Sequence, residues 1–470
     1  MIELISVTNN NVKHYAAVGI TAEELPVKEL GTGSTCMMLD TGKKYIYFEG
    51  NESWYEDKSG GAKGGGGETG AGILLDPEMV NFIDYDGKVV EQWSLDSLQE
   101  RTELPSCPDH AGLIAQGWNW TLEDIQDFGK PNVVGMLYVT DDGWTRFYLE
   151  ISERREISVS IYVDKLMKME IDWGDGVCET ISFNVGKTLY HVYEDSGDFV
   201  LRMYANGEEY KTGFIRYYDP ETKDGISNTM FGIVRKIESG VGIGFHANSF
   251  SYTNILETVT FTKDLTYIGA MTFSNSSIKA AVIPRGITGI PGSIFNEAKW
   301  LEVISFPREL LTIASKAFYR CQNLTFIVIP DRVTSIDSNV LAECSMLENV
   351  ILSDEISSGG ASLLYYCSKI KSVRLPDKMT LLPSQCLYYC SNLQKVIVGS
   401  HVETIGSNPF GLCKVLKKIY FLSANPPAGI TGLFKDVASG FVIYVPNGSG
   451  EAYKAAEYWS DYADNIVEME

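Results

Sequence analysis

The sequence predicts a multidomain, β-rich protein whose C-terminal half is a solenoid with a period of 23 residues. Three observations support this fold class. Five cysteines follow one another at intervals of 23 residues, and a short apolar run that ends in proline recurs with the same period. Upstream, a glycine-rich stretch at residues 59–72 separates two segments with strand-like patterns. A fixed period of this size is typical of a coil whose turns stack on their neighbours. The cysteines are Cys321, Cys344, Cys367, Cys390 and Cys413.

Each repeat is predicted to contain a short strand, a turn and a return segment. Residues 324–330 read Leu-Thr-Phe-Ile-Val-Ile-Pro, and their alternation of apolar and other positions is strand periodicity. Pro330 ends the strand because proline has no N–H to donate to a ladder. Residues 333–336 turn back toward the core. The segment that ends at Cys344 is predicted to be a short helical turn.

The units resemble BspA-type leucine-rich repeats, which occur in bacterial and phage surface proteins. The family pattern Leu-x-x-Ile-x-Ile-Pro-x-x-Val-x-x-Ile-Gly-x-x-Ala-Phe-x-x-Cys matches residues 301–321 in one frame, and the resemblance covers about residues 233–446. It implies a rigid coil that displays a binding surface. Residues 347–369 depart from the pattern because serine and glycine replace its middle, and we expect a bulge or a local contact there. The positions in register are Pro307, Ile313, Ala317 and Phe318.

The periodic cysteines have two interpretations. Equivalent residues of a solenoid stack about 4.7–5 Å apart, so a column of thiols can fill one layer of the core. The alternative is redox chemistry or metal binding, which needs close ligands with histidine or carboxylate nearby. Only Cys386 and Cys390 are close in sequence, and no histidine accompanies them. The core interpretation is therefore favoured, and we expect no metal and no cofactor.

The N-terminal segment is predicted to be a small β-module. Residues 32–55 show a strand, a turn at residues 40–42, a second strand and a closing Trp54. This segment resembles the small β-module of phage structural proteins, which implies docking to a virion. The glycine-rich residues 59–72 are interpreted as a flexible linker. A phosphate-binding loop is the alternative, but Lys63 is followed by glycine instead of serine or threonine.

Residues 73–150 are predicted to form hairpins around one short helix. One hairpin turns at Asp86-Gly87 and another at Asp142-Gly143. Thr121 is a candidate N-cap, with Asp124 completing a capping box. The run from Phe82 to Asp142 resembles a module of prophage tail and fibre proteins. Within it, Trp118 and Trp120 are interpreted as core residues, and the alternative is a platform for sugar rings.

Residues 151–217 resemble a PKD-type immunoglobulin-like sandwich. They contain the turn Trp-Gly-Asp-Gly at residues 173–176 and the triplet His-Val-Tyr at residues 191–193. The resemblance implies a spacer or adhesion module. Asp172 and Asp175 could ligate calcium, but calcium loops supply more carboxylates than this, and turn formation is favoured.

Charge and chemistry argue against several functions. The formal charge of −22 over 470 residues disfavours nucleic acid or an anionic membrane as the main partner. No apolar run spans a membrane, and no secretion signal is visible. The protein is therefore expected either to stay in the cytosol or to reach the outside by another route, and assembly into a virus particle in the host cytoplasm, followed by lysis, is one such route. The five histidines are scattered and match no catalytic motif. We therefore predict that the protein is not an enzyme.

One candidate binding site emerges beside the cysteines. The two positions before each cysteine are expected to point outward, and several of them hold tyrosine, which gives large contact area at low entropic cost. At 23-residue spacing, Tyr365 should stack with Tyr388, and Tyr366 with Tyr389. The alternative is that these rings only cover the edge of the coil. The candidate receptor-binding residues are Tyr319, Tyr365, Tyr366, Tyr388 and Tyr389.

Together these features favour a phage or prophage virion surface protein, first a tail fibre or receptor-binding protein that attaches to the host cell. The alternatives are a head decoration or head-fibre protein, a bacterial surface adhesin or scaffold, and a glycan-active enzyme. Expected partners are other virion proteins at the N-terminus, a host glycan or protein at the repeats, and further copies of the chain. The predicted parts are a docking β-module (1–58), a linker (59–72), a hairpin and helix module (73–150), a PKD-like sandwich (151–217), the repeats (218–446) and a cap helix (447–470).

Overall fold

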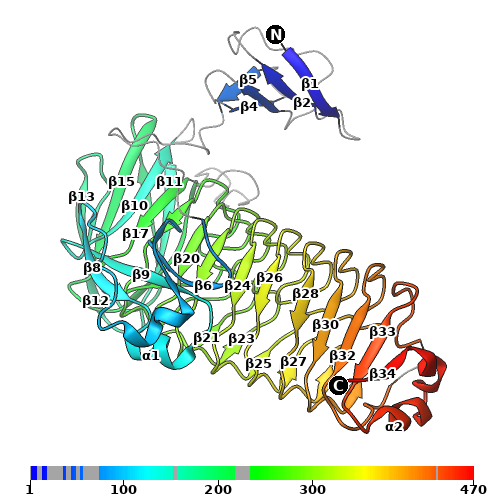
Figure 1. Cartoon of the computed structure of the whole chain (residues 1–470). Helices are drawn as coiled ribbons and strands as arrows, with labels where there is room; N and C mark the ends of the chain where they lie inside the picture. The colour runs from blue at the N-terminus through cyan, green and yellow to red at the C-terminus, as the bar shows by residue number, and fades with distance from the viewer. Residues whose placement is uncertain are drawn as a thin grey trace. The chain divides into compact units, whose positions relative to one another are not determined.

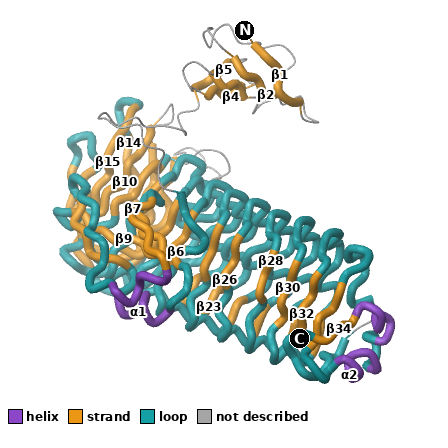
Figure 2. The backbone as a smooth tube through the Cα atoms, viewed as in Figure 1, coloured by secondary structure: helices purple, strands orange, loops and turns teal. Residues whose placement is uncertain are grey.

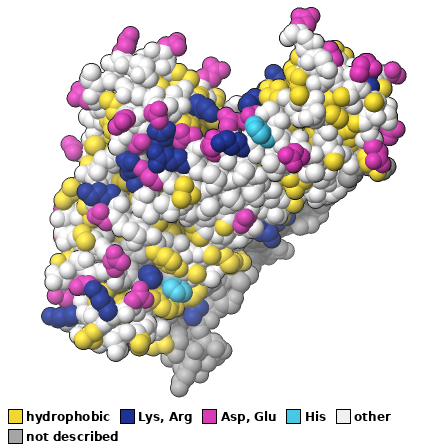
Figure 3. Space-filling model, turned by 90° about the horizontal axis from the view of Figure 1, so that it is seen from below, with side chains coloured by type: hydrophobic (Ala, Val, Ile, Leu, Met, Phe, Trp, Pro, Cys, Tyr) yellow, Lys and Arg dark blue, Asp and Glu magenta, His cyan; other side chains and the backbone are white. Residues whose placement is uncertain are grey.

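The computed structural model divides into two compact units, Met1–Ala71 and Gly72–Glu470, which we describe separately. It describes five strands within the first 73 residues and then residues 74–151, 156–217, 233–429 and 432–470. The predicted linker at 59–72 lies outside these ranges. Within them, no helix is long and apolar enough to cross a membrane. Charged side chains of both signs lie on the face drawn in Figure 3.

The first unit contains one five-stranded sheet with the strand order β1-β2-β3-β4-β5. The neighbours β3, β4 and β5 pair antiparallel, so the predicted hairpin over residues 32–55 is present. β2 and β3 pair in parallel. The strands are β1 (Ile2–Val7), β2 (Lys13–Ala17), β3 (Thr35–Met38), β4 (Lys44–Phe48) and β5 (Ser53–Glu56).

The second unit begins with a four-stranded sheet of order β7-β6-β9-β8 and a short helix, α1. The hairpin predicted at Asp86-Gly87 is confirmed, because β6 and β7 pair antiparallel. The capping box is confirmed as well: the Thr121 hydroxyl accepts from the Asp124 N–H, and the Asp124 carboxylate accepts from the Thr121 N–H. The elements are β6 (Met79–Ile83), β7 (Val89–Ser94), β8 (Leu113–Trp118), α1 (Leu122–Phe128) and β9 (Asn132–Thr140).

The hairpin predicted at Asp142-Gly143 is wrong. β10 (Thr145–Ile151) does not pair with β9 but with β15 and β17, in a different sheet. Gly143 has the positive φ of 77° that such a turn requires. An Asp-Gly turn therefore forms as predicted, but it passes the chain from one sheet to the next.

Two facing sheets make the sandwich, one of order β13-β12-β15-β10-β17-β19 and one of order β14-β11-β16-β18. The first sheet crosses both predicted boundaries, because β10 spans residue 150 and β17 and β19 come after residue 217. The second sheet crosses the boundary at residue 217 through β18. The sandwich and the repeats thus share strands and form one body. The strands are β11 (Glu156–Tyr162), β12 (Met167–Asp172), β13 (Cys178–Phe183), β14 (Lys187–Val192), β15 (Gly197–Tyr204), β16 (Tyr210–Tyr217), β17 (Val234–Glu238), β18 (Ile243–Phe245) and β19 (Thr258–Val259).

The repeats form the predicted solenoid, in which two rows of short parallel strands run along the coil (Figures 1 and 2). Leucine, isoleucine, phenylalanine and cysteine side chains fill the space between the rows. One row contains β20 (Ala280–Val282), β22 (Val303–Ser305), β24 (Phe326–Val328), β26 (Asn349–Ile351), β28 (Ser372–Arg374), β30 (Lys395–Val398), β32 (Lys418–Phe421), β33 (Val442–Val445) and β34 (Ile466–Glu468). The other contains β21 (Gly289–Ile290), β23 (Thr312–Ile313), β25 (Ser335–Ile336), β27 (Ser358–Gly359), β29 (Leu381–Leu382) and β31 (Thr404–Ile405).

The helical turn predicted before each cysteine is wrong. In the coil that ends at Cys344, Asn339 and Glu343 have left-handed φ values of 59° and 60°. Their N–H groups consequently point along the solenoid and donate to the carbonyls of Ala361 (2.9 Å) and Tyr365 (2.6 Å) in the next coil. Bonds to the next coil therefore alternate with a turn bond inside the segment, from the Ala342 N–H to the Asn339 carbonyl at 3.4 Å, and no continuous helical ladder forms.

The divergent repeat at 347–369 keeps its register, so the expected bulge is absent from it. Ser358 and Gly359 pair with Ser335 and Ile336 in parallel, without a shift. Gly360 follows, and a Cβ there would lie 2.1 Å from the Ser338 backbone nitrogen. Glycine is thus required at this close approach of two coils.

The sheet of β6 to β9 packs on the first strands of the solenoid through buried hydrogen bonds. The Asn119 Nδ2 group donates to the Ile283 carbonyl (3.0 Å) and to the Ser305 hydroxyl (2.9 Å). The Trp120 indole N–H donates to the Phe306 carbonyl at 2.6 Å. These bonds satisfy polar groups that docking removes from water.

The C-terminus closes the solenoid with a helical segment and a last strand. The cap helix predicted within residues 447–470 is shorter than expected, since α2 spans Gly450–Ala455 and a 3-10 helix follows at Ser460–Asn465. Tyr453 in α2 and Trp459 at the start of the 3-10 helix are fully buried and contact Phe421. This cap covers the core that the last repeat would otherwise expose.

Candidate functional site on the repeat region

The periodic cysteines form a buried column, which confirms their interpretation as core residues. All five have no exposed surface, and they are free thiols. Each thiol donates a weak hydrogen bond to a carbonyl of the preceding coil, such as Cys367 to Leu341 at 3.1 Å and Cys390 to Leu364 at 3.2 Å. The column therefore packs the core and supplies hydrogen-bond donors to buried backbone carbonyls.

The chemistry of the column is inert. Burial raises the pKa of Cys344 to about 12, and it raises the pKa of Cys367 and Cys390 well above the ordinary value. A thiol that stays protonated is neither a nucleophile nor a metal ligand. Among the residues that the structure describes, no three His, Cys, Asp or Glu side chains are grouped to hold a metal ion.

Four of the five candidate tyrosines form two stacked pairs beside this column. The ring centroids of Tyr366 and Tyr389 are 4.3 Å apart, with ring planes 1° from parallel. Those of Tyr365 and Tyr388 are 5.6 Å apart, with planes 3° from parallel. Tyr366 and Tyr389 are 40% and 36% exposed, whereas Tyr365 and Tyr388 are half-buried. The four rings make one aromatic surface, which we call the tyrosine surface.

The register of the coils brings these rings together. The Tyr366 N–H donates to the Tyr388 carbonyl, and the Tyr389 N–H donates to the Gly411 carbonyl, both at 2.8 Å. Tyr366 and Tyr389 share a left-handed φ of 61°. Equivalent backbone conformations at the coil spacing of about 4.8 Å direct the side chains in parallel. A side-chain hydrogen bond with Tyr389 raises the pKa of Tyr366.

The tyrosine surface ends one coil away on each side. Position 342, before Tyr365, is alanine, and position 411, after Tyr388, is glycine. A Cβ on Gly411 would lie 2.7 Å from the Tyr388 ring, so the glycine leaves room for that ring. The surface is therefore two coils wide.

Tyr319, the fifth candidate, lies apart from the other four. Its hydroxyl donates to the Glu343 carboxylate, which also accepts from Arg320 Nε at 2.7 Å. Partial burial and the bond to Glu343 raise the pKa of Tyr319. With its hydroxyl engaged and alanine at the stacking position of the next coil, Tyr319 is a neighbour of the tyrosine surface and not part of it.

The tryptophans predicted as core residues are buried. Trp118 is 8% exposed and Trp120 is 1% exposed. Their indole N–H groups donate to the carbonyls of Pro105 and Phe306, respectively. Neither ring is available as a platform for sugar rings.

The motif residues of the sandwich form a structural network. Trp173 is buried and stacks on His191 with 4.4 Å between the ring centroids. The Tyr193 hydroxyl donates to the Trp173 carbonyl at 2.9 Å, and His191 hydrogen-bonds Asp175 at 2.7 Å. The Asp175 carboxylate also accepts from the Val177 N–H, as a turn-forming aspartate does.

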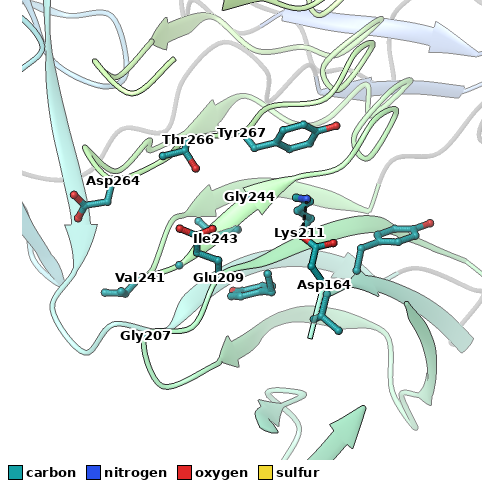
Figure 4. A pocket seen from close by; sticks show the side chains of 14 residues that line it. Asp164, Gly207, Glu209, Lys211, Val241, Ile243, Gly244, Asp264, Thr266 and Tyr267 are labelled. Carbon is teal, nitrogen blue, oxygen red and sulfur yellow. Dashed lines mark hydrogen bonds and ion pairs between the residues drawn. The ribbon is translucent and has the colours of Figure 1, made fainter. Parts of the chain in front are cut away.

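A hollow of 140 Å³ lies where the sandwich meets the first coil (Figure 4). Asp164, Glu209 and Asp264 contribute carboxylates to its wall. Lys211 pairs with Asp164 at 3.2 Å and lies 4.8 Å from the ring centroid of Tyr267. None of the residues that line this hollow is His, Cys or Ser. It is a small recess lined by carboxylates, one lysine and the Thr266 hydroxyl.

A further stacked pair was not predicted from the sequence. Tyr420 on β32 and Tyr444 on β33 have ring centroids 4.5 Å apart and planes 11° from parallel. They are 24 residues apart, so a search at a period of 23 misses them. The apolar alternation around each of them is the signal that could have found the pair.

Comparisons with known proteins agree with the repeat architecture. The family model described as a BspA type leucine rich repeat region matches in six copies, over residues 243–345 and 311–427. No curated protein sequence matches the chain.

Similar solved structures include three leucine-rich-repeat or surface proteins. A leucine-rich repeat protein from Bacteroides ovatus is 19% identical, with 60% of this chain and 90% of that chain covered and a TM-score of 0.30. The T. pallidum leucine-rich repeat protein is 23% identical, with 36% and 69% covered and a TM-score of 0.28. The pneumococcal vaccine antigen PcpA is 15% identical, with 54% and 81% covered and a TM-score of 0.30.

The 23-residue period, the two rows of strands, the buried cysteine column and the six matched copies agree. Residues 243–427 of this chain are similar to the BspA type leucine rich repeat region.

Proposed function

We propose that this protein is a non-enzymatic attachment protein whose repeat region binds a cell-surface glycan or protein. The observation that carries the proposal is the tyrosine surface, in which four rings from two coils lie together beside a rigid core. Stacking fixes the rings before a ligand arrives, so little side-chain entropy remains to be lost on binding. Tyrosine also offers both a ring face and a hydroxyl to a ligand.

We further propose that the chain is carried on the surface of a phage particle, first as a tail fibre or receptor-binding protein. The support is the resemblance of residues 32–55 to phage structural modules, together with the antiparallel order of β3, β4 and β5 in this segment. In this proposal the first unit docks to other virion proteins, and the assembled protein is a homo-oligomer. A head decoration or head-fibre protein would use the same parts.

A bacterial surface adhesin or scaffold is the second candidate. The match of residues 243–427 to the BspA type leucine rich repeat region supports it, because repeats of this type occur in bacterial surface proteins. Fractionation separates the two candidates. Mass spectrometry of purified particles detects the chain if it belongs to the virion, and its presence only in the cell envelope fraction would favour the adhesin.

The attachment proposal is tested with the full chain and intact cells of the producing or host strain. We expect Tyr365→Ala/Tyr388→Ala to lose binding while the fold persists. Tyr252→Ala/Tyr267→Ala is the matched control, because these tyrosines are 43% and 42% exposed on other coils. If the Tyr365→Ala/Tyr388→Ala variant binds cells as well as the control variant does, the tyrosine surface is not the attachment site.

A further inference from the structure

The charge of the chain reverses within the last repeats. Residues 369–418 contain eight Lys and Arg against two Asp and Glu, a formal charge of +6. The whole chain carries −22, so the remainder carries −28. The overall charge disfavours anionic partners, but a local patch acts over a Debye length of about 8–10 Å and can still attract them.

Six lysines of this segment, which we call the lysine strip, lie free of carboxylates. Arg374 and Lys378 do pair, with Asp354 and Glu355. For the six, no acidic side chain lies within 4.0 Å among the described residues. Five of them are exposed, and Lys395 is half-buried. The strip consists of Lys369, Lys371, Lys395, Lys414, Lys417 and Lys418.

The strip is continuous across three coils. Lys395 and Lys418 occupy paired positions on β30 and β32. The Gln394 N–H donates to the Lys371 carbonyl at 2.8 Å, and the Lys417 N–H donates to the Gln394 carbonyl at 3.0 Å. Like charges at paired positions of a sheet destabilise it. Folding thus holds together cations that repel each other, and an anionic ligand would relieve this repulsion.

The strip lies on a part of the strand row that the module of β6 to β9 leaves uncovered. That module contacts β20 and β22, and its ion pair between Lys130 and Asp354 reaches only the coil of β26. Beyond it, Tyr420 and Tyr444 stack next to the lysines. The Lys395 ammonium lies 5.0 Å from the Tyr420 ring centroid. Cations and half-buried aromatic rings therefore share one surface.

We propose that the lysine strip and the Tyr420–Tyr444 pair bind an acidic polysaccharide. The ammonium groups pair with its carboxylates, and the two rings offer a flat apolar surface on which sugar rings stack. A linear polymer fits the geometry because Lys395 and Lys418 lie one strand apart along the coil axis, about 4.8 Å, and Lys371 and Lys417 lie two strands apart. This surface shares no residue with the tyrosine surface, so each can be tested by its own variants.

The experiment measures binding of the full chain to polygalacturonate, with its fully methyl-esterified form as the uncharged probe. The test variant is Lys395→Gln/Lys417→Gln/Lys418→Gln. The control, Lys165→Gln/Lys168→Gln/Lys187→Gln, makes the same charge change on exposed lysines of the sandwich. We expect the wild type to bind only the charged polymer, with affinity that falls as salt rises. The test variant should bind at least ~10-fold more weakly at low salt, and the control as the wild type does.

Further measurements with tyrosine variants, lysine variants and a DNA probe decide the proposal. Tyr420→Ala/Tyr444→Ala should weaken binding of the polysaccharide, whereas Tyr365→Ala/Tyr388→Ala should not. Equal losses in the two lysine variants would mean that net charge alone governs binding and would overturn the proposal. The proposal would also be overturned if single-stranded DNA of matched charge bound as tightly as the polysaccharide, because the surface would then not be specific for its ligand. Thermal unfolding shows whether the test variant is folded, and the removal of like charges predicts that it is.

Discussion

Tyr366 and Tyr389 lie face to face, with ring centroids 4.3 Å apart and planes 1° from parallel, although they are separated by a full coil in sequence. The solenoid produces this contact, since both residues share one backbone conformation and one position in the repeat. Their stacking therefore belongs to the folded protein before any ligand is present.

The buried thiols should resist modification in the folded protein. Because burial raises the pKa of Cys344, Cys386 and Cys413 to about 12, their thiolate fraction at pH 8 is very small. We expect iodoacetamide to label the exposed Cys107 and Cys178 first. Peptide mass spectrometry before and after denaturation measures this order. Native-state labelling of the column at the rate of Cys178 would contradict the core assignment.

The Glu343 carboxylate should make a pH-dependent contribution to stability. Partial burial opposes ionisation, but hydrogen bonds from Tyr319 and Arg320 lower the pKa of Glu343 below its ordinary value of 4.5. The stabilisation is therefore present above pH 4.5 and is lost as the pH falls through the lowered pKa. Glu343→Gln should cost about 1 kcal/mol or less at pH 7, because the pair is partly exposed.

Thermal melting at several pH values checks this prediction. The difference in Tm between the wild type and Glu343→Gln should shrink as the pH is lowered from 7 to 3. A difference that stays constant would show that the charge of Glu343 does not cause it.

Trp120 should hold the module of β6 to β9 on the solenoid. Trp120→Phe removes the donor to the Phe306 carbonyl and leaves that buried acceptor unsatisfied, at a cost of about 1–3 kcal/mol. Hydrogen exchange should then rise in the strands β6 to β9, since their docking is weakened. Trp118→Phe is the control, because its indole bonds to Pro105 within the same module. Equal exchange in the two variants would argue against a docking role.

The repeat architecture could be predicted from the sequence because its core is periodic. Each cysteine fixes the frame, and every coil must bury the same positions to stack on the next. The turns before the cysteines could not be predicted, because residues such as Asn339 and Glu343 adopt left-handed conformations that only neighbouring coils stabilise. Local apolar spacing resembles a helix there.

The connections between sheets could not be predicted from the sequence either. An Asp-Gly turn has the same signal whether it closes a hairpin, as at Gly87, or moves the chain to another sheet, as at Gly143. The tyrosine pairs in register at 23 residues were predictable for the same reason as the cysteines. Tyr420 and Tyr444 were not, since one extra residue separates them.

Attachment through the tyrosine surface is measured by the binding curve of Tyr366→Ala/Tyr389→Ala on intact cells. Both rings are the exposed pair of the tyrosine surface, and the cysteines of the column are buried apart from them. We expect a loss of at least ~10-fold in apparent affinity, since truncation of an aromatic hot-spot residue in an interface costs about 2 kcal/mol or more. Tyr252→Ala/Tyr267→Ala should bind as the wild type does. A Tyr366→Ala/Tyr389→Ala variant that melts normally and binds cells with wild-type affinity would contradict the account.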